Sequence, residues 1–401
     1  MNKKISTLSK VILIILTLSL VLTGCKGEKN DEETSTKSGQ VKETVKQNID
    51  EDTGLVHESK LNLKYAKSFS VDYFKGGYKV ITDWEGHKTL LVPEGKEVPK
   101  LKKEMNVIQM PIKTIGVFST TNIAQLRPLG LMDKITLVTT EKDKWYIPEI
   151  KTMMNSGKIT YVGKNSAPDY ELIESIKPDI ILITTGTYHG QNETTQKFDE
   201  MGIKWIGEAS QRETDPRGRL EWVKLAGALF DKEKEADEFF EAQLKKIAEV
   251  EQKVKKVEDN KKEKFASVFL SGDVYYVRNK GDYEVKMFEL AGGKYILSDL
   301  NPDKDGNTKM NAEELYKGIE NADILFYNNL NGPSIQSISD LVSKAEYFRD
   351  IKAVKEGRVW GYKPYYYQNS DKVADIMKDL YTIFTTPKGK ITETEYFFLM
   401  K

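Results

Sequence analysis

Short apolar runs that alternate with polar residues dominate the chain from position 61 to position 110. Two such runs, 68–74 and 78–84, are separated by Lys75-Gly76-Gly77, and a third, 87–95, follows the turn Glu85-Gly86. Alternation broken by glycine-containing turns is typical of antiparallel hairpins. The pattern predicts a small β-meander over 61–110, packed on the main body, and we assign no chemistry to it.

The pattern changes at Pro111 to short β-branched runs separated by segments with helical period. The run "DIILIT" (179–184) is apolar on both faces, which is typical of a parallel strand covered by helices on each side. The helical segment before it closes at Lys177-Pro178. We therefore expect a doubly wound α/β lobe over 111–215.

A second lobe of the same kind is predicted over 261–401, and a long helical stretch over 216–260 joins the two. This stretch has no glycine or proline from Asp231 to Asn260, and it carries an apolar stripe at three- and four-residue steps: Ala236, Phe240, Leu244, Ile247, Val250 and Val254. Such a stripe indicates a stiff helix with one buried face. The fold class is therefore α/β: two doubly wound lobes joined by one long helix, with a small N-terminal β-meander.

The beginning of the chain indicates export. Three lysines precede an apolar run, 11–22, which is too short to cross a bilayer and is followed by "TGC". Residues 1–24 are read as a signal peptide, and Cys25, directly after Leu22-Thr23-Gly24, resembles the acylated cysteine of bacterial lipoproteins; a plain secretory signal is the alternative. Residues 25–60 are charged and poor in large apolar side chains, which predicts a flexible tether. We expect an extracytoplasmic protein, anchored to the outer face of the cytoplasmic membrane through lipidated Cys25.

Cysteine and charge narrow the chemistry further. Cys25 is the only cysteine, so its use for lipid leaves no thiol for a disulfide, a Cys-metal site or an iron–sulfur cluster. The 61 basic and 61 acidic residues balance, and removal of 1–24 takes away three lysines and no acid. This balance gives no electrostatic drive toward nucleic acid.

Four segments, in order, resemble the substrate-binding proteins of ABC importers that have a rigid inter-lobe helix and bind ferric siderophores, haem or cobalamin. They are "TIGVFSTTNIAQLRPLGLMDKI", "YELIESIKPDIILI", "DPRGRLEWVKLAGALFDKEKEADEFF" and "FELAGGKYI". The resemblance covers 111–384, with Pro128 expected to interrupt the first helix. It implies a monomeric receptor with no cofactor of its own, which passes an iron chelate or a tetrapyrrole to an ABC permease and, through it, to an ATPase.

Ligands of open α/β sheets bind beyond the carboxyl ends of the strands. This rule places the following residues of the two lobes at a cleft between them: Ser119, Thr120, Thr121, Trp145, Tyr146, Thr187, Tyr188, His189, Tyr276, Arg278, Tyr365, Tyr366 and Tyr367. In "GYKPYYYQ", at most two or three rings of an extended segment can face one ligand. Aromatic walls suit large, partly apolar chelates, although packing within the lobe would also explain these tyrosines.

Charged candidates are arginines rather than metal ligands. His57, His87 and His189 are far apart in the sequence, so we expect no site for a bare metal ion. Arg212, Arg217 and Arg219 suit an anionic siderophore or propionates, or else pack at the start of the helix.

The resemblance also implies a docking surface on each lobe, where one acidic residue pairs with arginines of the permease. Glu171 matches this position in the first lobe, and Glu313 or Glu314 matches it in the second.

Two other classes of function stay open. A surface-anchored hydrolase would use His189 as its base, although none of the familiar nucleophile, zinc or nucleotide motifs is present, so we expect no enzyme. A cell-surface adhesin or sensor would bind no small molecule.

Overall fold

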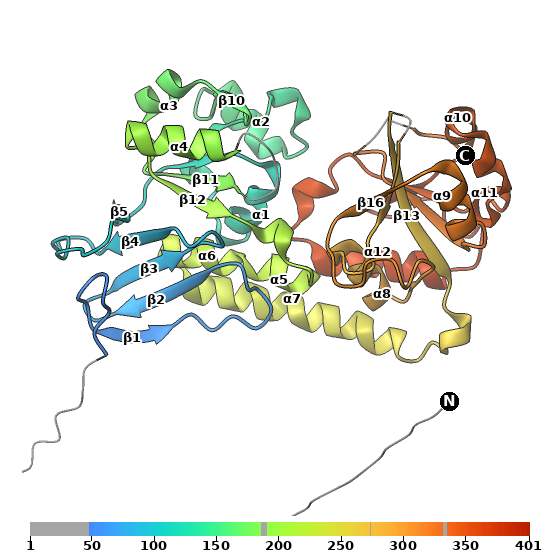
Figure 1. Cartoon of the computed structure of the whole chain (residues 1–401), viewed down its shortest axis with the longest axis horizontal. Helices are drawn as coiled ribbons and strands as arrows, with labels where there is room; N and C mark the ends of the chain where they lie inside the picture. The colour runs from blue at the N-terminus through green and yellow to red at the C-terminus, as the bar shows by residue number, and fades with distance from the viewer. Residues whose placement is uncertain (1–47, 186–190, 273, 332–334) are drawn as a thin grey trace, which may run out of the picture. The chain divides into compact units, whose positions relative to one another are not determined.

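The structure is a computed structural model, which describes residues 48–185, 191–272, 274–331 and 335–401 (Figure 1). All of these lie in one compact unit, Gln47–Lys401. Four predicted functional residues, Cys25, Thr187, Tyr188 and His189, lie outside the described residues. Within the described part of the chain, no helix is both long enough and apolar enough to span a membrane.

An amino-terminal extension, residues 48–110, forms a five-stranded sheet in the order β1-β2-β3-β4-β5. The predicted meander is its antiparallel part, to which β5 adds in parallel. β1 falls inside the predicted tether 25–60, which is therefore too long at its carboxyl end, because β1 pairs with β2 and His57 contacts Asp72 at 3.0 Å. The strands are β1 (His57–Lys60), β2 (Ser70–Phe74), β3 (Tyr78–Thr82), β4 (Lys88–Val92) and β5 (Asn106–Gln109).

The amino-terminal lobe, 111–215, has a fully parallel sheet in the order β12-β11-β6-β7-β8. All five residues of β11 are buried, as the apolar run predicted. Pro128 shortens the first helix, which ends at Leu126 and continues as a 3-10 turn. The strands are β6 (Ile115–Val117), β7 (Ile135–Val138), β8 (Thr160–Tyr161), β9 (Gly163–Lys164), β10 (Ala167–Pro168), β11 (Ile180–Thr184) and β12 (Trp205–Glu208); the helices are α1 (Ile123–Leu126), α2 (Pro148–Asn155), α3 (Tyr170–Ile176) and α4 (Gln191–Met201).

The connecting stretch is three helices rather than one: α5 (Pro216–Glu221), α6 (Val223–Leu229) and α7 (Glu233–Val254). The helical conformation is interrupted between α6 and α7 at Asp231, whose φ of 52° is left-handed. Ala236, Phe240, Ile247, Val250 and Val254 of the predicted stripe are buried. This face packs on α6 and on α12 (Val373–Thr385), so α7 runs along both lobes as a rigid link (Figure 1).

The carboxyl-terminal lobe, 261–401, has a mixed sheet. β15, β13, β17 and β18 pair in parallel, as expected for a doubly wound lobe, whereas β14, β16 and β19 add antiparallel edges. The strands are β13 (Lys264–Ser271), β14 (Val274–Arg278), β15 (Lys294–Tyr295), β16 (Asn307–Met310), β17 (Ile324–Tyr327), β18 (Val359–Tyr362) and β19 (Phe397–Leu399); the remaining helices are α8 (Tyr283–Leu290), α9 (Ala312–Ile319), α10 (Ile338–Lys344) and α11 (Lys352–Lys355).

Polar contacts tie the lobes together directly as well as through α7. The buried carboxylate of Asp371 accepts hydrogen bonds from Arg127 of the first lobe. The Gln368 amide donates to the carbonyl of Lys144 at 2.8 Å and accepts from the N–H of Tyr146 at 2.8 Å. We call these contacts the inter-lobe latch. Together with α7, they predict that the separation of the lobes changes little when a ligand binds.

Candidate functional site

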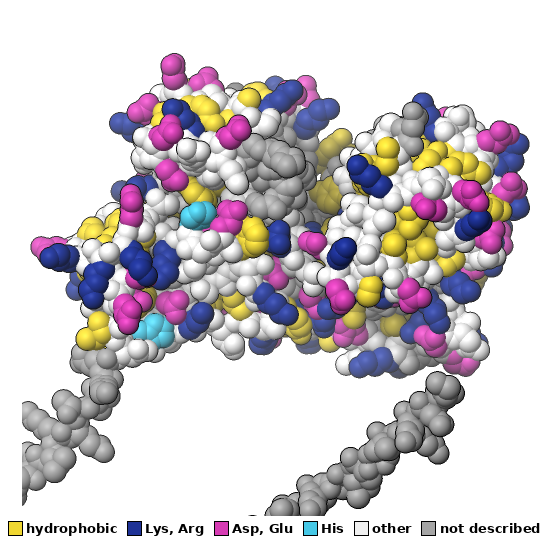
Figure 2. Space-filling view, in the orientation of Figure 1, with side chains coloured by type: hydrophobic (Ala, Val, Ile, Leu, Met, Phe, Trp, Pro, Cys, Tyr) yellow, Lys and Arg dark blue, Asp and Glu magenta, His cyan; other side chains and the backbone are white. Residues whose placement is uncertain are grey.

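A cavity of about 630 Å³ lies between the lobes and is lined by both of them. Its walls include three of the residues predicted in the first lobe and two of those predicted in the second: Ser119, Thr120, Thr121, Arg278 and Tyr367. Cavities of this size hold small molecules of drug-like dimensions. On the face in view in Figure 2, the surface is hollowed between the lobes, and acidic and basic side chains are mixed over both.

The hydroxyls of the first wall follow from how β6 ends. Ser119 lies just beyond this strand and caps the 3-10 turn Thr120–Asn122, with its Oγ 2.8 Å from the Oγ1 of Thr121. The Thr121 backbone N–H donates to the same Oγ at 3.4 Å. The cap holds these short polar side chains at the carboxyl edge of the sheet, where the rule for open α/β sheets places a ligand.

Arg219 lines the cavity from α5 and carries unused hydrogen-bonding capacity. Its Nε donates to the carbonyl of Glu213 at 3.2 Å and its Nη2 to that of Gln211 at 2.5 Å, while its guanidinium lies 3.1 Å from the centroid of the Tyr283 ring. Arginine has five N–H donors, so three have no acceptor among the described residues. No described acidic side chain forms an ion pair with it. Arg219 therefore offers the cavity a positive charge with free donors.

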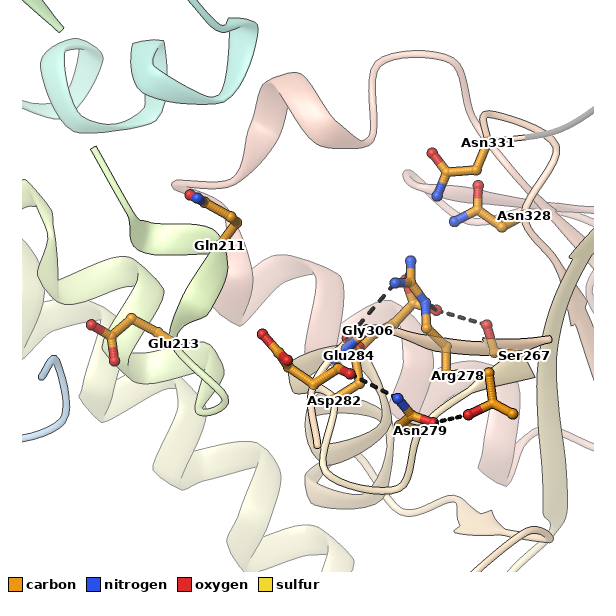
Figure 3. A network of polar contacts seen from close by, with 12 residues as sticks. Gln211, Glu213, Ser267, Arg278, Asn279, Asp282, Glu284, Gly306, Asn328 and Asn331 are labelled. Atoms are coloured by element: carbon orange, nitrogen blue, oxygen red, sulfur yellow. Dashed lines mark hydrogen bonds and ion pairs between the residues drawn. The ribbon is translucent and has the colours of Figure 1, made fainter. Parts of the chain in front are cut away.

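Arg278 lies on the opposite wall but is already neutralised. It donates to the fully buried carboxylate of Glu284 at 3.2 and 3.3 Å, and Asp282 lies 3.7 Å away. Burial lowers the pKa of Arg278, but these two carboxylates hold it well above its ordinary value. Figure 3 shows the three side chains together, with Gln211 across the open space. Because the two carboxylates compensate its charge, Arg278 stabilises the cavity wall more than it attracts an anion.

Tyr367 presents a neutral phenol to the cavity. Its oxygen accepts hydrogen bonds from Asn328 at 2.6 Å, Asn331 at 3.1 Å and Arg278 at 3.4 Å, and both amides are labelled beside Arg278 in Figure 3. Burial raises the pKa of Tyr367, although these donors act in the other direction. With its lone pairs engaged, the hydroxyl proton is the group that Tyr367 can offer to a ligand oxygen.

A smaller, mostly apolar cavity of about 70 Å³ continues from this one. It shares Thr121, Arg219 and Tyr367 with the larger cavity and adds Met287 and Tyr366. The Tyr366 ring is buried, and its hydroxyl has no hydrogen-bond partner among the described residues. Tyr366 thus borders the smaller cavity.

Four predicted ligand residues do not reach either cavity. Trp145 is fully buried in the core, where its indole N–H donates to the carbonyl of Thr140, so its placement at the ligand was wrong. The placement of Tyr146 and Tyr365 at the ligand was also wrong. Their rings meet edge to face beside the inter-lobe latch, with the ring centroids 6.4 Å apart. Tyr276 stacks on Phe269 at 4.8 Å within the sheet. These side chains stabilise the lobes and their junction instead.

The predicted docking residues lie on exposed helix faces. Glu171 is in the first turn of α3. On α9, Glu313 pairs with Lys317 at 2.6 Å, whereas the Glu314 carboxylate accepts from the backbone of Asn311 in a capping box. An exposed i,i+4 ion pair contributes little, so Glu313 can exchange Lys317 for a partner more easily than Glu314 can leave the capping box. Docking stays a prediction for all three.

Glu208, at the end of β12, is fully buried behind the cavity wall. Its Oε1 accepts from the Gln125 amide at 2.7 Å and from the N–H of Ser210 at 3.0 Å. Burial raises the pKa of Glu208 above its ordinary value of 4.5 in spite of these hydrogen bonds. The folded state therefore binds its proton more tightly than the unfolded state does.

This shift predicts a pH dependence of stability. Since the folded-state pKa is the higher one, the free energy of unfolding falls as pH rises from 4.5 through the raised value. We expect Glu208→Gln to remove this fall. In denaturant titrations, the free energy of unfolding of the variant should therefore rise relative to that of the wild type as the pH increases. Glu94→Gln, an exposed loop control, should follow the wild type. Parallel curves for Glu208→Gln and wild type would contradict the assignment.

Sequence reasoning missed two prominent cavity residues, Gln211 and Tyr283. Tyr283 directly follows Asp282, the N-cap of α8, and no local pattern distinguishes it from a packed aromatic. From the sequence, Arg219 had two alternatives, ligand binding or packing at the start of the helix. The structure places it at the cavity, which the sequence could not decide. Among the described residues, no cluster of His, Cys, Asp or Glu side chains could hold a metal ion.

Comparison with known proteins decides the family. Residues 118–366 match the model of the family described as periplasmic binding protein. The chain belongs to this family. A lipoprotein of Methanocaldococcus jannaschii, itself uncharacterised, is 30% identical over 363 residues and spans 84% of each chain. The family match begins after the extension, which is thus an addition to the matched region.

Solved structures of the same fold extend the comparison. The petrobactin-binding protein YclQ from Bacillus subtilis aligns with a TM-score of 0.55 at 16% identity, over 82% of this chain and all of that one. The periplasmic heme-binding protein RhuT from Roseiflexus sp. RS-1 aligns with a TM-score of 0.54 at 16% identity, over 69% of this chain and all of that one. At these identities the likeness shows the fold, and it confirms the predicted two-lobed architecture.

Proposed function

We propose that the protein is the extracytoplasmic substrate-binding lipoprotein of an ABC importer and captures an anionic ferric chelate of the siderophore type. The observation that carries this proposal is the cavity between the lobes, where Arg219, which has no ion-pair partner within the described part of the chain, meets hydroxyls and aromatic rings. Family membership and the relative named a lipoprotein support the receptor role. Lipidation of Cys25 and delivery to a permease and its ATPase belong to the same proposal.

The chemistry of the cavity suits a chelate rather than a bare ion. A chelator supplies the oxygen ligands of ferric iron itself, so the protein needs to bind only the rim of the complex. Arg219 offers charged donors, Tyr367 offers a phenol proton, and Ser119 and Thr120 add short hydroxyls. The faces of Tyr283 and Tyr367 provide apolar contact area, with each ring contact worth about 0.5–1.5 kcal/mol beyond burial.

The test is binding of the soluble protein, without its lipid, to a panel of ferric catecholate and ferric citrate complexes, haem and cobalamin. We expect calorimetric binding and a retained visible absorbance with an anionic ferric complex. Selective retention of haem or cobalamin would move the ligand to the tetrapyrroles, the second class that the fold accommodates. Binding of none of them would overturn the proposal, and conversion of a bound chelate into a new product would make the protein an enzyme.

Docking to the permease gives a separate prediction. Glu171 and Glu313 lie on exposed helices of different lobes, so reversing their charges should leave the cavity intact. We expect Glu171→Arg and Glu313→Arg to keep the affinity for the chelate and to lower chelate uptake by cells. Rim charges mainly set encounter and register, so a severalfold loss of uptake is expected from each. Glu94→Arg serves as the exposed control, and uptake unchanged in the other two variants would exclude these residues from docking.

A further inference from the structure

The amino-terminal extension contacts the cavity loop directly. The loop Ala209–Glu213 leaves β12 and brings Gln211 and Arg212 to the cavity. Trp84, in the turn between β3 and β4 of the extension, lies under Arg212, with the guanidinium 3.8 Å from the centroid of the indole ring. An aromatic face under a guanidinium both attracts and orients it.

A second contact fixes the end of the same loop. The buried carboxylate of Glu213 accepts hydrogen bonds from the backbone N–H groups of Lys67 and Ser68, both at 2.9 Å, and from the Trp222 indole at 3.2 Å. The carbonyl of Glu213 in turn accepts from Nε of Arg219. A series of hydrogen bonds therefore connects the extension, through Glu213, to Arg219.

The extension also packs closely against β12, the strand that leads into the loop. The carboxylate of Asp83, next to Trp84, lies so close to Gly207 that a Cβ at this position would meet its Oδ2 at 2.5 Å. Only glycine fits at position 207 without moving Asp83. Three successive parts of the segment 207–213 thus rest on the extension, which lies outside the matched family region.

We propose that the extension is a working part of the ligand site, in which Trp84 is a positioning residue for Arg212 and the Lys67–Ser68 backbone positions Arg219 through Glu213. This inference rests on the proposed function, because the two arginines are taken to bind an anionic ferric chelate. Its consequence is that the affinity of the cavity depends on a residue that does not line it.

A double-mutant cycle tests the role of Trp84, with ferric tris-catecholate and ferric citrate as the probes in calorimetry. We expect Trp84→Ala to weaken binding by about twofold to fivefold, Trp84→Phe to restore most of it, and Trp84→Ala to have no further effect in an Arg212→Ala background. Tyr78→Ala removes another aromatic of the same sheet, whose hydroxyl donates to the carbonyl of Glu97 at 2.8 Å, and should leave the affinity unchanged. An equal loss from Trp84→Ala with and without Arg212 would overturn the inference.

A readout without ligand separates this inference from the proposed function. In the unliganded protein, ¹⁵N relaxation of the Arg212 Nε should show more motion in Trp84→Ala than in wild type, with no change in Tyr78→Ala. Unchanged motion of Arg212 would overturn the positioning role. A wild type that binds neither probe nor the wider panel would overturn the proposed function, and the relaxation result would then decide the positioning role on its own.

Discussion

Replacing Arg219 with alanine is expected to weaken binding of an anionic ferric chelate by roughly 10- to 100-fold. Hydrogen bonds to charged groups contribute about 1.5–3 kcal/mol, and three N–H donors of Arg219 have no partner among the described residues. The loss should appear in calorimetric titrations, and it should shrink at high salt because part of the attraction is electrostatic.

Arg217 provides the matched control for this experiment. It lies two residues earlier on α5 but pairs with Asp215 at 2.8 Å and Glu251 at 3.4 Å and stacks on Tyr65. Burial raises the pKa of Asp215, but its ion pairs with Arg217 and Lys286 dominate and lower it to about 2. Arg217→Ala should therefore lower stability and leave the affinity within twofold. An Arg219→Ala variant that binds as tightly as wild type would remove the charged group from the proposed site.

Replacing Glu284 with alanine should lower the free energy of unfolding more than any other substitution proposed for this protein. Glu284 is fully buried and accepts from Arg278, from Ser267 at 2.7 Å and from Tyr362 at 2.8 Å. Removing one partner of a buried ion pair costs about 3–5 kcal/mol, and because Asp282 still faces Arg278, we expect about 3 kcal/mol. Denaturant unfolding of the soluble protein measures this difference.

A double variant distinguishes the ion pair from simple loss of packing. Glu284→Leu combined with Arg278→Met removes both charges of this pair and keeps much of the volume, so it should recover part of the stability lost in Glu284→Ala. Asp282 then loses Arg278 as its partner, but it still accepts from the N–H groups of Glu284 and Gly306. The double variant should also retain Tyr367 at the cavity through Asn328 and Asn331. A loss below about 1 kcal/mol in Glu284→Ala would show that the buried network is not what holds this wall.

Those residues whose positions follow from strand direction could be predicted from the sequence. Ser119, Thr120 and Thr121 follow β6, and parallel strands end at one edge of the sheet, so a local pattern places them at the cavity. The tyrosine cluster was only partly resolved. Tyr367 and Tyr366 border the cavities, whereas Tyr365 lies against Tyr146. The alternation of an extended segment does not reach these residues, because β18 ends at Tyr362 and a turn follows at Pro364 and Tyr365.

The parts of the site that sequence could not reveal depend on contacts between distant segments. The hydrogen bond from Lys67 to Glu213 joins residues 146 positions apart, and nothing near either residue indicates the other. Trp145 shows the opposite problem, since a loop aromatic beside the cleft is indistinguishable in sequence from one that fills the core. The break at Asp231 was missed for a related reason, because an ordinary residue there adopts a left-handed conformation.

The most direct measurement is a crystal structure of the soluble protein grown with the ferric complex that binds best, in which the iron is located by its anomalous scattering. We expect one iron position in the cavity between the lobes, with Arg219 and Tyr367 within hydrogen-bonding distance of chelator oxygens. Iron bound elsewhere, for example in the groove beside His87 and Trp205, with the cavity between the lobes unoccupied, would contradict it.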